Sequence, residues 1–261
     1  MKNLMRFSLL AILSIGVLVY VGCSSDSGGG TKNFSSKTDA DAALAQSTAQ
    51  INLAINDVKN VANIAGSFGL TKSMAYTYDA GTGWWSNVYT QSSSGYTYNY
   101  DFRHRFTPRD ANGYATDATD AMEYMYDYSY NGSSTGYVYD LSYLSDINCG
   151  GLIGYRASTG NLSVNGSSAI DYNFEFSYTG TTYNYVWSYD NAYNGVEFAH
   201  GTTYPVSGTI TFTSKFSLTP EIPGYDNYNV SGTITFTGGT TATLEFGGFT
   251  YTINLQTGTI S

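Results

Sequence analysis

The sequence predicts a mainly β protein with one long N-terminal helix, in which an antiparallel meander forms a strongly curved sheet or open barrel packed on the helix. Apolar residues recur at steps of three and four over residues 38–65, the spacing of one helix face. From about residue 73 onward the period changes to two, the spacing of strand faces. Turn-forming pairs separate the alternating segments, and short turns between two-faced strands make hairpins. Residues 38–261 are therefore expected to form a single β-rich domain.

The expected helix over residues 38–65 has a start, a stop and one apolar face. Thr38 can cap its N-terminus, and Asp39 and Asp41 in the first turn suit the positive end of the helix dipole. Gly66 stands where a C-terminal stop belongs. The apolar face packs either on the sheet, which we favour, or against another chain as a coiled-coil seam. Its members are Leu44, Ile51, Ile55, Val58, Ala62 and Ala65.

Aromatic and polar residues alternate along the strand-like part of the chain, so each strand is expected to have one aromatic face and one polar face. A sandwich with the helix at one edge and a closed barrel are alternative ways to bury the aromatic face. The alternating segments are 96–103, 122–130, 137–141, 172–178 and 183–189. The turn signals between strands are Asn131-Gly132, Thr179-Gly180, Asn194-Gly195, Gly238-Gly239 and Gly247-Gly248.

One internal repeat occurs near the C-terminus. Residues 206–213 and 230–237 both read VSGTITFT. A solenoid needs at least three stacked units, so two copies indicate equivalent strands of one hairpin-built sheet. About a dozen strands are expected, with no second helix between them.

The N-terminus carries an export signal. Lys2 and Arg6 precede an apolar run over residues 8–21, which is shorter than the roughly 20 residues of a spanning helix and is typical of a signal peptide. Tyr20-Val21-Gly22-Cys23 then resembles the bacterial lipobox, with Tyr20 where a Leu-like residue is usual. The resemblance implies a signal peptide over 1–22 and lipidation of Cys23.

Residues 23–37 are expected to be the lipidated cysteine and a flexible tether, because Ser and Gly dominate them. Ser24 next to Cys23 resembles the sorting signal for the outer membrane, where Asp would resemble inner-membrane retention. The predicted location is therefore the cell envelope, as an outer-membrane lipoprotein. The sequence leaves open on which side of that membrane the domain lies, and its oligomeric state.

The charge balance excludes nucleic acid as a partner. The chain has 11 Lys and Arg against 20 Asp and Glu, and removing the signal peptide takes Lys2 and Arg6 away, which leaves 9 against 20, a net charge of −11. Nucleic-acid binding needs clustered cations. Attachment to the membrane must likewise come from acyl chains and not from basic residues.

No residue set in the chain resembles a catalytic centre, so we expect no enzyme. Residues 132–136 match G-x-S-x-G, but they lie between two strand-like segments and not at a strand-to-helix elbow. His104 and His200 are the two histidines, and no zinc motif surrounds them. With Cys23 lipidated, Cys149 has no partner for an internal disulfide. We expect it to be a small buried apolar residue.

One loop has the composition of a calcium site. Asp110, Asn112, Asp117 and Asp120 supply carboxylate and amide oxygens at close spacing, and Ca²⁺ prefers such ligands. The pattern is not an EF-hand, and the same residues are common in exposed loops. Calcium is the one cofactor that the sequence suggests.

The aromatic residues suggest a binding function. Trp84 and Trp85 point to opposite faces of a strand, and the exposed one, with Tyr89, is the candidate ligand-binding surface. The sequence favours a non-catalytic envelope lipoprotein that binds an apolar or amphipathic ligand, such as a lipid, or an envelope partner. A surface adhesin or a carbohydrate-binding lipoprotein is the alternative, and a hydrolase is third. A lipid carrier would need a cavity between sheet and helix.

Overall fold

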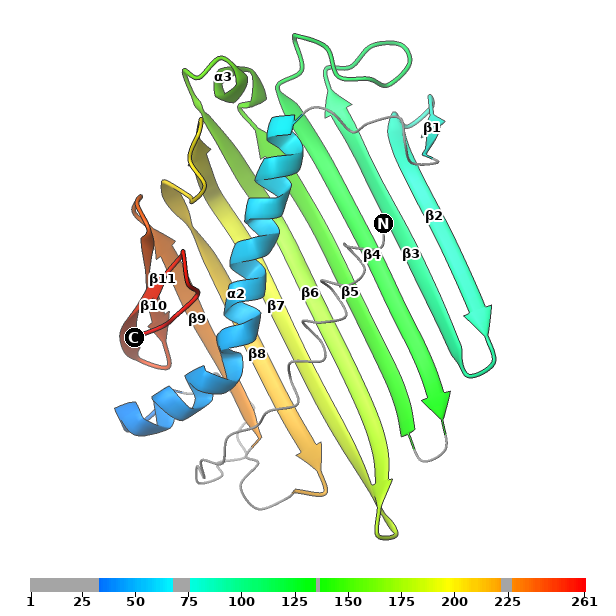
Figure 1. Cartoon of the computed structure of the whole chain (residues 1–261), viewed down its shortest axis with the longest axis vertical. Coiled ribbons are helices and arrows are strands. Elements are labelled where there is room, and N and C mark those ends of the chain that lie inside the picture. The colour runs from blue at the N-terminus through cyan, green and yellow to red at the C-terminus, as the bar shows by residue number, and fades with distance from the viewer. Residues whose placement is uncertain (1–32, 68–75, 135–136, 222–226) are drawn as a thin grey trace.

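The computed structural model describes residues 33–67, 76–134, 137–221 and 227–261. It is mainly β, with 60% of residues in strands and one long helix, α2 (Lys37–Ser67). An 11-stranded sheet holds the strands in the order of the chain, from β1 to β11 (Figure 1). Every neighbouring pair is antiparallel, which confirms the predicted meander, and the sheet is not closed into a barrel.

The strands are longest in the middle of the sheet, where β6 has 18 residues and β7 has 19. The first strand begins at Thr77, and residues 68–75, which include the predicted start at about 73, lie outside the described part of the chain. The bounds are β1 Thr77–Asp79, β2 Trp84–Ser93, β3 Tyr96–Thr107, β4 Ala121–Ser134, β5 Tyr137–Gly150, β6 Asn161–Tyr178, β7 Thr181–Ala199, β8 Ser207–Thr219, β9 Tyr228–Phe236, β10 Thr241–Phe246 and β11 Phe249–Asn254.

Three of the predicted turns are confirmed, and two are wrong. Thr179-Gly180, Gly238-Gly239 and Gly247-Gly248 each separate two strands. Asn131-Gly132 instead lies inside β4, where Asn131 Nδ2 donates to Asp140 Oδ1 on β5 at 2.8 Å. A cross-strand partner thus keeps this pair in the ladder.

Asn194-Gly195 lies inside β7 and forms a bulge. Gly195 has φ +55°, and the register with β8 shifts between Asn194 and Glu197. Tyr193 and Val196 are both buried although two residues lie between them, a spacing that places side chains of a regular strand on opposite faces. The extra residue of the bulge resets the alternation of faces. The strand continues on both sides because β6 and β8 pair with it there.

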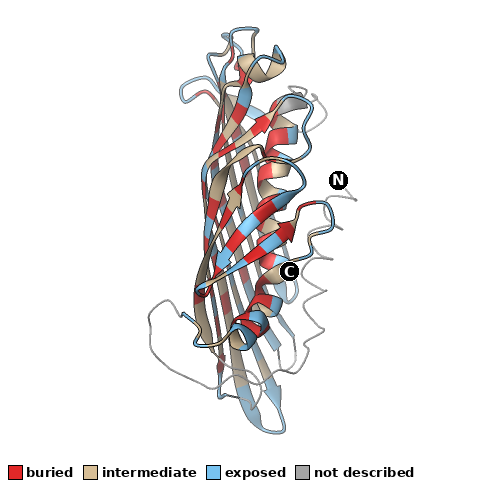
Figure 2. Ribbon diagram, turned by 90° about the vertical axis from the view of Figure 1, so that its left-hand side faces the viewer, coloured by how far each residue is buried: buried red, intermediate tan, exposed pale blue. Residues whose placement is uncertain are grey.

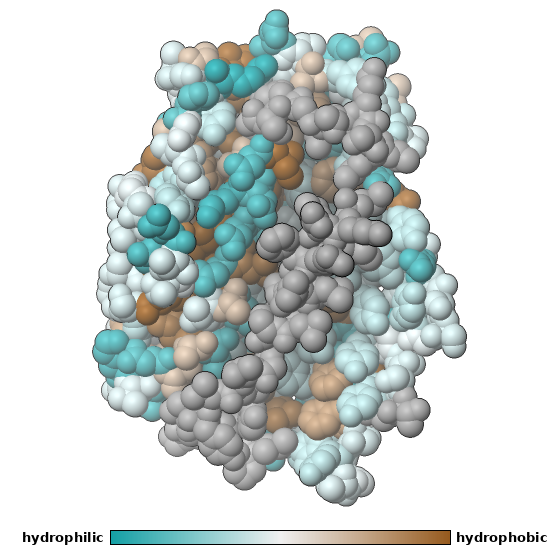
Figure 3. All heavy atoms as spheres, viewed as in Figure 1, coloured by the Kyte–Doolittle hydropathy of each residue, from teal (hydrophilic) through white to brown (hydrophobic). Residues whose placement is uncertain are grey.

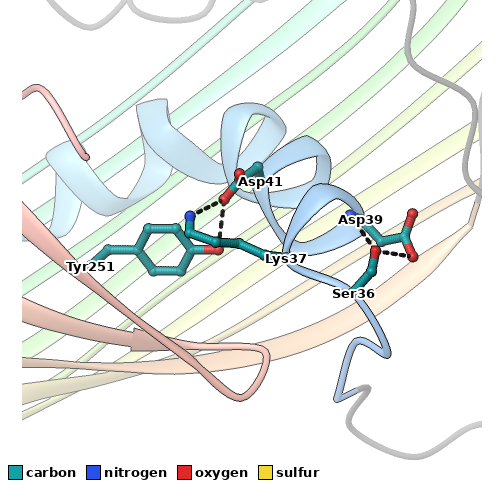
Figure 4. Close-up of polar contacts among 5 residues, drawn as sticks. All are labelled: Ser36, Lys37, Asp39, Asp41 and Tyr251. Carbon is teal, nitrogen blue, oxygen red and sulfur yellow. Dashed lines mark hydrogen bonds and ion pairs between the residues drawn. The ribbon is translucent and has the colours of Figure 1, made fainter.

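The helix begins one residue earlier than predicted and ends two residues later, and Ser36, not Thr38, caps it. Ser36 Oγ accepts a hydrogen bond from the Asp39 backbone N at 3.2 Å and donates to Asp39 Oδ2 at 2.8 Å (Figure 4). This reciprocal pair satisfies an N–H of the first turn, which has no partner inside the helix.

The apolar face of α2 lies against the sheet of the same chain (Figure 2). Ile51, Ala54 and Val58 are completely buried, and they belong to one core with Leu162 of β6 and Tyr193 of β7. The packing confirms the favoured interpretation of the stripe, since the sheet already occupies the face that a coiled coil would use.

The C-terminal hairpin holds the helix from the other side. Tyr251 on β11 donates to Asp41 Oδ1 at 2.9 Å, and Phe34 stacks on Phe246 with ring centroids 6.1 Å apart. Further along α2, Asn52 Nδ2 donates to the carbonyl oxygen of Gly258 at 3.0 Å. The helix is thereby fixed between the middle and the end of the sheet.

The repeat forms the two neighbouring strands β8 and β9, with Ile210 paired to Ile234. This confirms the prediction of equivalent strands. The expectation that no second helix lies between the strands is wrong, because a short helix, α3 (Leu152–Arg156), follows β5. Its first residue, Leu152, is completely buried. Across the described ranges, no helix is long and apolar enough to cross a membrane.

Candidate functional site

The two faces of the sheet differ in chemistry. One face carries the aromatic residues and meets α2, since Tyr143 on β5 and Tyr193 on β7 both reach Asp57 of the helix. The other face is polar and acidic, with Asp101 directly opposite Asp127. Strand register produces this separation, because aromatic residues pair with aromatic residues from strand to strand.

A broad field of rings covers the part of the helix-facing side that the long strands β3–β7 form. Tyr139, Phe174 and Tyr185 pair across three strands, which shows how the rings align. Each ring is half-buried, unlike the completely buried residues under α2. We call this set the aromatic field: Tyr98, Tyr100, Tyr126, Tyr128, Tyr130, Tyr139, Tyr172, Phe174, Phe176, Tyr183 and Tyr185.

Many rings of the aromatic field stand upright and stack on each other. Phe174 lies 5.0 Å from Tyr139 and 5.4 Å from Phe176, and Phe176 lies 5.1 Å from Tyr183, with interplanar angles of 24°, 20° and 18°. Rings side by side in one plane cannot approach so closely, because their edges would collide. Neighbouring rings therefore cover part of each other's faces.

The tyrosines of the aromatic field remain hydrogen-bond donors. Burial raises the pKa of Tyr100 and of Tyr128 to about 12. The rings on β3 and β4 meet edge to face, with 5.2 Å between Tyr98 and Tyr128 and 5.4 Å between Tyr100 and Tyr126. The surface thus combines apolar edges with neutral phenol groups.

A carboxyl group borders the aromatic field at the helix. Asp57 Oδ2 accepts hydrogen bonds from Tyr143 Oη at 2.8 Å and Tyr193 Oη at 3.4 Å. Tyr193 in turn bonds Ser168 Oγ at 2.6 Å, and Asn191 Nδ2 donates to the same oxygen at 3.0 Å. Burial raises the pKa of Asp57 to about 6, and the two tyrosine hydroxyls limit the rise. The carboxyl is therefore partly protonated near pH 6.

Sequence reasoning missed Asp57. It lies next to Val58, a completely buried member of the apolar stripe. A charged residue beside such a stripe was a usable signal. Its partners were not predictable, since Tyr143 and Tyr193 lie 86 and 136 residues away in the chain.

The structure separates the predicted ligand-binding residues. Trp85 is on the helix-facing side, where its Nε1 donates to the Gly113 carbonyl oxygen at 2.8 Å. Trp84 is on the other side, and the Arg105 guanidinium lies 4.7 Å from its ring. Tyr89 is 48% exposed and lies 5.9 Å from Tyr98, so of the three only Tyr89 adjoins the aromatic field.

The four predicted calcium ligands have separate roles. Asp110 Oδ1 accepts from the backbone N of Asn112 and of Tyr114, and Asp120 Oδ1 accepts from the backbone N of Ile153. The carbonyl oxygen of Asp117 accepts from Arg156 Nη2 at 3.3 Å. In the described ranges, no three His, Cys, Asp or Glu side chains gather as a metal site would require. Calcium binding stays a prediction.

Two side chains that could take part in catalysis, His104 and Cys149, are buried, whereas His200 is exposed. His104 is 3% exposed, and burial lowers its pKa to about 4. Its ring is stacked 6.5 Å from that of Trp85. Burial raises the pKa of the Cys149 thiol to about 12, which keeps the sulfur protonated and unreactive.

Two shallow hollows lie on the polar side of the sheet. One, of about 160 Å³, is lined by Asp101, Arg103 and Asp127. The other, of about 90 Å³, is lined by Asp140 and Asp171 among others. Neither lies between the sheet and α2. Comparison with protein-family models, curated proteins and solved structures finds no match to the chain.

Proposed function

We propose that the protein is a non-catalytic lipoprotein of the cell envelope, anchored at Cys23, whose aromatic field binds an apolar or amphipathic ligand or an envelope partner. The observation that carries the proposal is the alignment of half-buried rings on the side of the sheet that meets the helix. The lipobox-like residues and Ser24 support an outer-membrane location.

The aromatic field suits the ligand better than the helix–sheet interior. Under α2 the side chains of Ile51, Val58, Leu162 and Val164 have no exposed surface, so this region is filled by the protein itself. Beside the helix, the rings keep part of their surface free. A ligand would therefore lie along the sheet, against the side of α2.

The chemistry of the aromatic field favours an amphipathic ligand over a sugar. Sugars bind by stacking on open ring faces, but Phe174 and Phe176 cover one another at 5.4 Å. Ring edges suit acyl chains, and phenol groups donate to neutral oxygen acceptors such as esters. Carbohydrate binding is for this reason the second candidate.

Replacing Cys23 with Ala is expected to abolish lipid attachment. The chain, expressed with its signal peptide in a bacterial host fed radiolabelled palmitate, should be labelled and recovered with the membranes. The Cys23→Ala variant should carry no label. Cys149→Ala is the matched control, since that thiol is buried and its loss should leave labelling unchanged. An unlabelled wild-type chain would remove the anchor from the proposal.

Replacing Phe174 with Ser is expected to weaken ligand binding about tenfold, which is about 1.4 kcal/mol, because it removes the ring that contacts Tyr139 and Phe176. Residues 24–261, which hold every described element, would be titrated with a dansyl-labelled fatty acid and the emission followed.

The matched control for this titration is Leu144→Ser, which removes an exposed apolar side chain from the polar side of the sheet. It should leave the affinity unchanged. Equal affinities for Phe174→Ser and the wild type would show that the aromatic field does not bind the probe.

A further inference from the structure

Three hairpins point toward one end of the molecule. In a meander, alternate turns lie at the same end of the sheet. The turns β2–β3, β4–β5 and β6–β7 accordingly share the lower end in Figure 1. Strand β8 ends there as well and is followed by the exposed Glu221, so only the first three turns are considered below. The strands that they join include the longest in the protein, so this end extends well beyond α2.

These hairpin ends carry no charge in an acidic protein. Residues 80–100, 128–139 and 176–189 contain no Asp, Glu, Lys or Arg. The chain as a whole has 20 Asp and Glu against 11 Lys and Arg. In Figure 3 the described atoms of this end are mostly pale, which means neither strongly hydrophilic nor strongly hydrophobic. Such a surface enters a lipid interface without desolvating an ion.

The same hairpin ends expose large side chains to solvent. Tyr178 is 66% exposed, Val138 48%, Tyr137 44% and Tyr96 36%. Tyrosine favours the membrane–water boundary, where its ring contacts lipid and its hydroxyl contacts water. We call these four residues the hairpin tips.

The anchored end of the chain enters the domain on the same half of the molecule. Figure 1 shows that α2 begins in the half toward which the three hairpins point. Nine residues lie between Cys23 and Asn33, the first described residue, so the chain from one to the other spans at most about 35 Å. A lipidated Cys23 would therefore keep this half of the domain close to the membrane.

The aromatic field continues down to the hairpin tips. Tyr96 stacks with Tyr130 at 6.2 Å, and Tyr137 stacks with Phe174 at 6.0 Å. Ring contacts continue from Phe174 through Tyr172 and Tyr185 to Phe216, which belongs to the core that includes α2. This continuity favours a lipid bilayer as the partner of the hairpin tips, because a bilayer there would directly adjoin the proposed ligand-binding surface.

We propose that the hairpin tips are a membrane-contact site, which seats the end of the sheet in the interface of the bilayer that holds the acyl chains of Cys23. The proposal rests on the anchor of the proposed function and not on the ligand of the aromatic field. The sheet then stands on the membrane through three uncharged hairpins and one covalent lipid.

A fluorescent probe at Tyr178 tests the contact in the lipidated full-length protein, processed by its host and reconstituted in phosphatidylcholine vesicles. The Tyr178→Cys variant carries the dye NBD at that position, and Cys149 is buried from the reagent. Emission should rise about threefold on reconstitution, as the dye leaves water for the interface, and a nitroxide-labelled lipid should quench it. The matched control is Thr203→Cys in the exposed β7–β8 turn, at the opposite end, which should show neither effect.

Flotation of the same vesicles separates failure of the tips from failure of the anchor. Protein that does not float has no lipid anchor, which overturns both proposals. If the protein floats but the probe at residue 178 is as exposed to solvent as the probe at residue 203, the anchor is present and the proposed membrane contact is overturned. A rise in emission that nitroxide lipid does not quench would place protein, such as a second copy of the chain, at the tips and would also overturn it.

Discussion

Replacing Gly166 with Ala is expected to lower the free energy of unfolding by more than about 3 kcal/mol, from steric overlap added to backbone strain. Gly166 is in β6 opposite the bulge of β7. Its φ is +139°, a backbone conformation that residues other than glycine rarely adopt. A Cβ there would come within 2.1 Å of the Asp146 carbonyl oxygen and 2.8 Å of the Ile147 Cα on β5. Both are backbone atoms, so the β5–β6 ladder itself would have to move.

Gly201→Ala separates the overlap from the strain. Gly201 also has a positive φ, +75°, but a Cβ there meets nothing within 4 Å. Its substitution should cost only about 1 kcal/mol, the backbone part alone. Urea unfolding followed by tryptophan fluorescence measures both variants. Equal midpoints for the two would show that the sheet accommodates the Cβ of residue 166.

Replacing Asp57 with Asn is expected to stabilise the protein above pH 6 and to have little effect near pH 4. The pKa of Asp57 is raised from 3.8 to about 6 in the folded protein, so the folded state holds its proton more tightly than the unfolded state. As the pH rises from about 4 to about 6, the unfolded state loses this proton first, and the wild-type protein loses stability. Above about pH 6 both states are ionised and the cost stays constant.

At pH 8, Asp57→Asn should stabilise the protein by about 2 kcal/mol. A change in pKa corresponds to about 1.36 kcal/mol of free energy per unit. The expected stabilisation is smaller than this conversion gives, because Asp57 is only partly buried and solvent screens its charge. The Asn side-chain oxygen can still accept from Tyr143 Oη. Thermal unfolding between pH 4 and pH 8 measures the difference. Asp146→Asn, an exposed carboxylate on the opposite side of the sheet, is the control and should change stability by less than about 0.5 kcal/mol at every pH. Parallel pH curves for Asp57→Asn and wild type would contradict the raised pKa of Asp57.

Local patterns predicted most elements of the fold because each is encoded by neighbouring residues. Alternation of rings and polar residues identified β3, β4, β6 and β7, and the apolar stripe identified α2 within two residues of its ends. The paired copies of VSGTITFT identified β8 and β9. In each case a period of two or 3.6 residues determines which side of the backbone is apolar.

The same local patterns failed where a neighbouring strand decides the outcome. Asn131-Gly132 and Asn194-Gly195 have the composition of hairpin turns. Asn131 is instead held in the ladder by Asp140 across the strand, and Gly195 forms a bulge because β6 and β8 continue to pair beyond it. The turn propensity of a pair is smaller than the free energy of two continuing ladders, and those ladders are not visible locally.

The amino-acid sequence by itself determined the long helix, most of the strands and the presence of one aromatic face, since these follow from residue spacing. Only the tertiary structure decided which of those rings are buried, which stay partly exposed and which residues they contact. Register between strands brings Tyr139, Phe174 and Tyr185 into one row. The position of α2 completely buries the side chains beneath it, while the rings beside the helix stay half-buried. The meeting of Asp57 with Tyr143 and Tyr193 likewise needs the helix to lie across β5 and β7. Contacts between residues far apart in the chain depend on packing, and packing has no signature in the spacing of neighbours.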